Sequence, residues 1–106
     1  MNPLLAHYGV AVHHPEVSGA EHLELLQIRD QLAGLEPLLT AEELEALGVA
    51  DATLAAQAPR VQRELQRFVD LAVYRREHNI PPERWWWYLD VIQHVPRPPS
   101  ATPAGA

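Results

Sequence analysis

Three consecutive tryptophans lie in the stretch PPERWWWY, residues 81–88, where the proline pair predicts the start of a helix. Successive side chains of an α-helix are turned by about 100°, so the rings of Trp85, Trp86 and Trp87 would point in three different directions. A core of this size can bury one or two of these rings, but hardly all three. The remaining aromatic surface must be covered by another chain, by a ligand or by the rest of the fold.

Capping signals mark helix starts on the N-terminal side of this stretch. Ser18 is a good N-cap, and Glu21 completes a capping box three residues later, so a helix is expected over residues 18–34. Thr40 caps a second helix in the same way. This helix is expected to be short, near residues 40–48, because it meets a glycine that suits the left-handed position after a helix.

A long apolar stripe at helical spacing predicts the main helix over residues 59–78. Pro59 opens it as an early-turn proline, and Asn79 ends it. The proline pair at residues 81 and 82 then forces a turn into the tryptophan helix, which is expected over 82–95. We therefore predict an all-α fold, a small bundle of three longer helices and one short capped helix, over 18–34, 59–78, 82–95 and 40–48.

The two ends of the chain differ from this helical domain, which we place at residues 18–95. Residues 1–17 contain a short stretch with strand character that ends at His13-His14-Pro15, and they are expected to form an extended arm packed on the helices. Residues 96–106 are rich in proline and alanine, which is typical of a disordered or polyproline-like tail.

The composition excludes several classes of site. The 106 residues contain no cysteine, so disulfides, thiolate metal sites and thiol nucleophiles are absent, and a cytoplasmic location is favoured. No apolar run approaches the roughly 20 residues that a membrane span needs, and the N-terminus lacks the basic start of a signal peptide. Motifs for a catalytic triad, a phosphate loop or a metalloprotease are missing from the sequence. We expect a protein that is not an enzyme, with no catalytic residue and no cofactor.

The charges are divided unevenly along the chain, which carries a net charge of −6 and no lysine. Residues 1–51 hold nine acidic side chains against one arginine, a net charge of −8. Residues 52–106 hold seven arginines against five acidic side chains, a net charge of +2. This asymmetry lets the two halves attract each other within the fold, or lets two copies dock head to tail.

The leading functional hypothesis is a protein–protein interaction module, either a homo-oligomer or a small accessory subunit, that uses an aromatic face on the last helix. Tryptophan, tyrosine and arginine are enriched at the energetic centres of protein interfaces. The predicted anchors are Trp86, Trp87 and Tyr74, with Arg84 and Arg67 at the rim. The competing interpretation is that the tryptophans simply fill the interior of the bundle.

Two further hypotheses stay open. Arginines along residues 63–84, together with Tyr74 and the tryptophans, have the composition of a surface for single-stranded nucleic acid, although interleaved acids and the overall charge disfavour it. Histidine is a common zinc ligand, and four histidines fall in the first 22 residues, at positions 7, 13, 14 and 22. Their spacing matches no established metal motif, so we assign no metal ligand.

Overall fold

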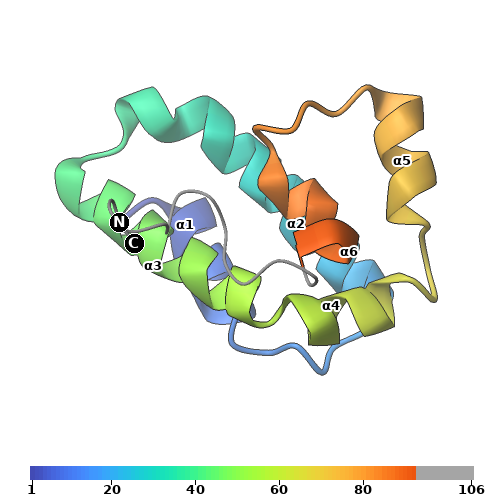
Figure 1. The fold of residues 1–106 in the computed structure, drawn as a ribbon. Helices are drawn as coiled ribbons and strands as arrows, with labels where there is room; N and C mark the ends of the chain where they lie inside the picture. Colours follow the sequence, from blue (N-terminus) through green and yellow to red (C-terminus); the bar gives the residue numbers. More distant parts are fainter. Residues whose placement is uncertain (93–106) are drawn as a thin grey trace, which may run out of the picture.

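The computed structural model describes residues 1–92 of the chain. All secondary structure within these residues is helical, which confirms the all-α prediction (Figure 1). The predicted tail over 96–106 lies outside the described residues. Six α-helices and two 3₁₀-helices follow in this order: α1 (Pro3–Ala11), α2 (Gly19–Leu35), η1 (Glu36–Leu38), α3 (Ala41–Ala56), α4 (Ala58–Leu65), α5 (Leu71–His78), η2 (Trp85–Tyr88) and α6 (Leu89–Ile92).

The N-terminal segment is a helix, so the predicted extended arm over residues 1–17 is wrong for most of its length. The side chain of Asn2 accepts hydrogen bonds from the backbone N–H groups of the first turn, and a proline occupies an early helical position. Leu5, Tyr8 and Val12 are buried at helical spacing. These contacts with the rest of the fold override the local strand character of the segment.

Helix α2 follows the sequence prediction closely, because its signals are local. The hydroxyl of Ser18 accepts a hydrogen bond from the Glu21 backbone N–H at 3.3 Å. The first residue of the helix, Gly19, lies directly against α4: a Cβ atom there would stand 2.6 Å from the backbone oxygen of Glu64. Glycine is therefore needed at this position for the two helices to approach each other.

Helix α3 begins where the sequence predicts but runs further. The complete capping box of Thr40 and Glu43 is present. The predicted stop at Gly48 is wrong, since the helix continues through this glycine to Ala56. Leu47, Ala50 and Leu54 are buried at successive helical positions, and their packing offsets the modest cost of a glycine inside a helix.

The predicted single helix over 59–78 is two helices, α4 and α5. Helix α4 ends at Leu65, and the side chain of Asp70 caps α5 by accepting the backbone N–H of Val73 at 3.2 Å. Aspartate favours this capping role over a helix interior, which accounts for the break. Helix α5 ends as expected at Asn79, which adopts a left-handed conformation with φ of 51°.

The tryptophan segment differs from the predicted helix over 82–95, of which residues 93–95 lie outside the described residues. Residues 85–88 form the 3₁₀-helix η2, and α6 adds four more residues. A 3₁₀-helix has three residues per turn, so the first and fourth side chains of η2 lie on one side. Trp86 and Trp87 are the two residues of η2 that are buried.

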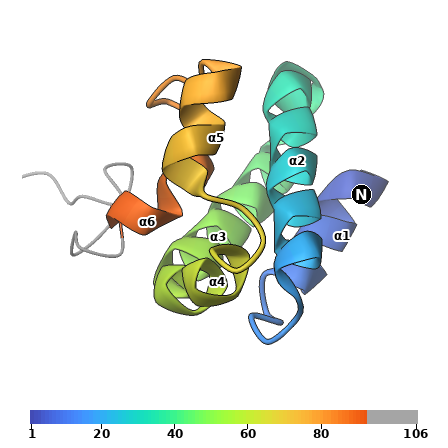
Figure 2. The same ribbon diagram turned by 90° about the vertical axis from the view of Figure 1, so that its right-hand side faces the viewer.

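Helices α2 and α4 pack against each other at the centre of the fold. Helix α1 contacts α2 and α3, while α6 contacts α4 from the other side, and Figure 2 shows α1 and α6 flanking the central helices. Among residues 1–92, no helix combines the length and the apolar character that crossing a bilayer requires.

Candidate functional site

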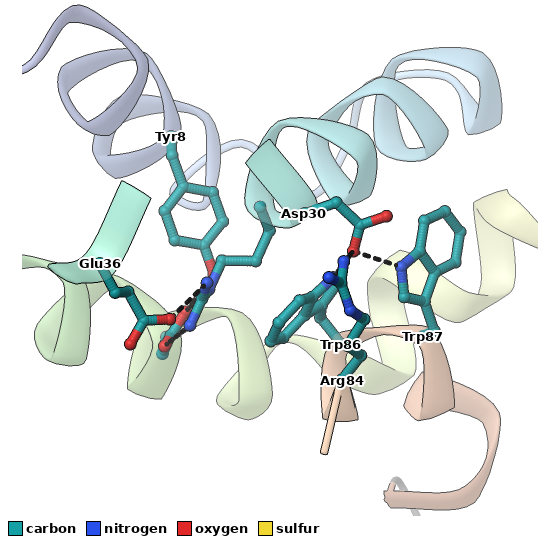
Figure 3. Close-up of polar contacts among 8 residues, drawn as sticks. Tyr8, Asp30, Glu36, Arg84, Trp86 and Trp87 are labelled. Carbon is teal, nitrogen blue, oxygen red and sulfur yellow. Dashed lines mark hydrogen bonds and ion pairs between the residues drawn. The ribbon is translucent and has the colours of Figure 1, made fainter. Parts of the chain in front are cut away.

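The tryptophan pair is held in the interior by one carboxylate. Trp86 and Trp87 are 3% and 0% exposed. Their indole Nε1–H groups donate to the same oxygen of Asp30, Oδ1, at 2.9 and 2.8 Å (Figure 3). Arg84 donates to this oxygen from Nη1 at 2.7 Å. A buried indole N–H needs an acceptor, and this one carboxylate on α2 serves both rings.

Ring stacking completes the surroundings of the two indoles. The Tyr74 ring stacks on the Trp87 ring with 4.6 Å between their centroids. The His78 ring also stacks on Tyr74, with 3.9 Å between their centroids. The guanidinium of Arg29 lies 4.1 Å from the ring centroid of Trp86, which is cation–π geometry. The aromatic cluster is therefore satisfied by residues of α2 and α5.

A second polar network lies beside this cluster and joins α1, α2 and α3. Nε and Nη2 of Arg29 donate to the two carboxylate oxygens of Asp51 at 2.9 and 3.0 Å, and Glu36 lies 3.4 Å from Nη1. The Tyr8 hydroxyl donates to Asp51 at 2.6 Å. Burial, followed by the negative charge of Asp51, raises the pKa of Tyr8 far above its ordinary value. Burial opposes the charge on Arg29, but Asp51 outweighs it and raises the pKa of the guanidinium.

A third cluster centres on Arg75 in α5. This side chain forms an ion pair with Asp90 and donates to the backbone oxygen of Trp87 at 3.0 Å. Its guanidinium lies 4.5 Å from the ring centroid of Tyr88, whose hydroxyl donates to the backbone oxygen of Ile80 at 2.7 Å. These contacts attach α5 and α6 to each other.

The predicted partner-binding residues do not form one exposed face. Trp86, Trp87, Tyr74 and Arg84 do come together, but the two indoles face the interior and are covered by the fold itself. Arg67 is separate: its side chain is 73% exposed and lies 3.7 Å from Glu64. The hypothesis that Trp86 or Trp87 anchors a protein interface therefore finds neither indole exposed within the chain.

The nucleic-acid hypothesis relied on the same side chains. Arg75 and Arg84 each pair with a carboxylate, and Trp86 and Trp87 are buried. Internal contacts therefore occupy part of the groups that the hypothesis placed on a surface, while Arg63, Arg67 and Arg76 are exposed.

The N-terminal histidines do not converge on a metal site. Within residues 1–92, no group of three or more potential ligands is arranged to hold an ion. His22 is buried with Nε2 at 3.0 Å from the backbone oxygen of Pro15, and His14 lies 3.4 Å from Glu16. His7, His14 and His22 line a cavity of about 260 Å³ together with carboxylates and apolar side chains.

The sequence prediction missed one surface feature, the outward face of α3. Val49 is 63% exposed and Leu44 is 42% exposed. Gly48, Ala52 and Ala56 are also exposed on this helix. The predicted stop at Gly48 concealed the pattern, because only an uninterrupted helix places Val49, Ala52 and Ala56 on one side, with Leu44 on the flank.

The same face continues into α4. The buried positions keep one helical phase across the junction at Gln57: Leu47, Ala50, Leu54, Ala58, Val61 and Leu65. Their spacing of three or four residues means that the exposed positions also keep one phase. Arg60 and Arg63, both exposed, therefore extend the outward face beyond Ala56.

We call the exposed residues of this side the α3–α4 face: Glu42, Glu45, Gly48, Val49, Ala52, Ala56, Arg60 and Arg63. Its start is acidic and its middle is apolar, and its end carries two arginines that line a hollow together with Pro15, Glu16 and Glu64. Among the interactions within residues 1–92, none pairs its glutamates or its arginines with an opposite charge.

Comparison of the chain with protein-family models, curated proteins and solved structures found no match.

Proposed function

We propose that this protein is a non-enzymatic interaction module that associates with itself through the α3–α4 face, with a cytoplasmic location as part of the same proposal. The observation that carries the proposal is the exposure of Val49, 63% exposed, in line with the exposed Ala52 and Ala56, on the side of α3 opposite the buried Leu47, Ala50 and Leu54. Large apolar side chains gathered on one exposed face are typical of an interaction surface.

Burial of these side chains supplies the driving force for association. Removing apolar surface from water contributes about 25 cal/mol per Å². The glutamates and arginines at the two ends of the face form a charged rim around its apolar middle, which is the usual composition of a protein interface. Trp86 and Trp87 contribute nothing to this surface, since both are buried inside the fold.

The size of the face indicates weak association. Helices α3 and α4 together run from residue 41 to residue 65, about 37 Å at a rise of 1.5 Å per residue. Contact along one such helix pair falls at the small end of protein interfaces. We therefore expect a dissociation constant of about 1–100 μM.

The experiment is sedimentation equilibrium from about 1 μM to about 1 mM, a range that brackets this constant. The wild type is expected to shift from monomer to dimer. Val49→Asp is expected to weaken the dimer at least about tenfold, because a carboxylate would be buried without a partner. Val10→Asp is the matched control, since Val10 is 61% exposed on α1, outside the α3–α4 face. It should associate like the wild type.

Circular dichroism of both variants checks that their helix content equals that of the wild type. A wild type that stays monomeric over the whole range would overturn the proposal. Equal weakening by the two variants would overturn the assignment to this face.

A further inference from the structure

Resting on the proposed self-association, we infer that the two copies pair their α3–α4 faces in antiparallel orientation, around a two-fold axis near the level of Leu54. Glu45 of one copy then lies opposite Arg63 of the other, and Ala52 opposite Ala56. The occupant of the face is thus a second copy of this chain in one defined register.

The α3–α4 face is continuous across the two helices. Helix α4 continues the course of α3 with only a bend between them (Figure 1). The single residue between the helices, Gln57, keeps the hydrogen-bonding in register: its N–H bonds to the oxygen of Thr53, and its oxygen accepts from Val61. The outward residues therefore form one long strip that a second strip can follow along its length.

The charges along the strip favour antiparallel pairing. The strip carries Glu42 and Glu45 at its beginning and Arg60 and Arg63 at its end. Antiparallel pairing sets the acidic end of each copy against the basic end of the other, twice in a symmetric dimer. Parallel pairing would instead place glutamate against glutamate and arginine against arginine, which is unfavourable.

The shape of the strip and the spacing of its exposed residues also fit antiparallel pairing. The exposed positions 45, 49, 52, 56 and 63 keep close to the midline of the strip at helical spacing. With the two-fold axis at the level of residue 54, residue 45 of one copy faces residue 63 of the other. In the same way residue 49 faces residue 59, and residue 52 faces residue 56. The central positions are the small residues Ala52 and Ala56, and at Gly48 an added Cβ would meet no atom within 4 Å. Small side chains let two helices approach to about 8 Å between their axes.

Charge reversal tests the pairing directly by sedimentation equilibrium. Glu45→Arg and Arg63→Glu each replace two attractive contacts with two repulsive ones, so each variant alone is expected to weaken the dimer about tenfold. The double variant Glu45→Arg/Arg63→Glu restores both contacts and is expected to dimerise like the wild type. In a parallel dimer, Glu45 would face Glu45 and Arg63 would face Arg63. Each single variant would still place like charges opposite each other, so neither would weaken that dimer further.

Introduced cysteines test the register, because the natural chain has none. A mixture of Ala52→Cys and Ala56→Cys is expected to form a cross-linked dimer on mild oxidation, as these positions face each other across the axis. Val49→Cys alone should not cross-link, since its two copies would lie about 15 Å apart along the helices. A parallel dimer would instead cross-link Val49→Cys with itself.

The outcomes separate the two proposals. If Val49→Asp dissociates the dimer but the single charge variants do not weaken it and Val49→Cys cross-links, the antiparallel register is wrong and self-association stands. If the wild type is monomeric at every concentration, both proposals fail together.

Discussion

The indole N–H of Trp87 donates to Asp30 over 2.8 Å, a bond between residues 57 positions apart in the chain. The same carboxylate oxygen accepts from Trp86 and Arg84, so one acidic side chain on α2 decides where the tryptophan segment lies. An aromatic run that resembles an exposed binding surface is thereby drawn into the interior.

Replacement of Asp30 by alanine is expected to lower the free energy of unfolding by about 2–4 kcal/mol, since two buried indole N–H groups and a guanidinium lose their acceptor. Asp30→Asn keeps an oxygen but loses the charge, so its cost should be smaller. Urea unfolding followed by tryptophan emission measures both. The control Glu24→Gln, on an exposed carboxylate of the same helix, should change the free energy by less than about 0.5 kcal/mol.

Tyr8→Phe is expected to destabilise the protein by about 1–3 kcal/mol, because it removes a buried hydrogen bond to the Asp51 carboxylate. The raised pKa of Tyr8 also makes a pH prediction. The folded protein holds this proton more tightly than the unfolded chain, so stability should fall as the pH rises above about 10. Denaturation should be measured between pH 9 and pH 11, about one unit either side of the unfolded tyrosine pKa. The loss of stability with rising pH should be smaller for Tyr8→Phe than for the wild type. An identical loss in both proteins would contradict the buried phenol.

Gly19→Ala is expected to destabilise the fold by more than about 1 kcal/mol, because its Cβ would stand 2.6 Å from the Glu64 backbone oxygen and 2.9 Å from the Cβ of Phe68. Gly34→Ala is the matched substitution in the same helix, where an added Cβ meets no atom within 4 Å. It should raise the stability by up to about 1 kcal/mol through helix propensity. Thermal unfolding of the two variants compares them. Loss of stability in both would show that the contact with α4 is not the cause.

Glu43 is expected to contribute stability that is lost in acid. Hydrogen bonds from the backbone N–H groups of Thr40 and Asn2 lower the pKa of its carboxyl in the folded protein. Its contribution is therefore present above the unfolded value of about 4.3 and disappears as the pH falls through the lower folded value. Unfolding measured from pH 6 down to pH 3, a range that includes that value, should show a shallower acid loss for Glu43→Gln than for the wild type. Parallel curves would exclude this role.

Local signals in the sequence predicted the starts of two helices correctly. The caps at Ser18 and Thr40 each involve a partner only three residues away, so the interaction is visible in the sequence itself. Asn2 caps α1 in a comparable way. This cap was not predicted from the sequence.

The candidate surface required the correct helix boundary. Gly48 is a strong stop signal by itself, and its continuation into a helix depends on how Leu47, Ala50 and Leu54 pack. Only after this is known do Val49 and the arginines of α4 fall on one outward face.

The sequence alone determined the all-α class, the capped starts of α2 and α3, and the end of α5 at Asn79, since each depends on composition or on residues within one helical turn. The tertiary structure decided which aromatic rings are buried, where α3 and α4 end, and which helix face stays open. These outcomes depend on partners far apart in the chain, such as Asp30 and Trp87, and contacts of that separation leave no periodic pattern in a single sequence.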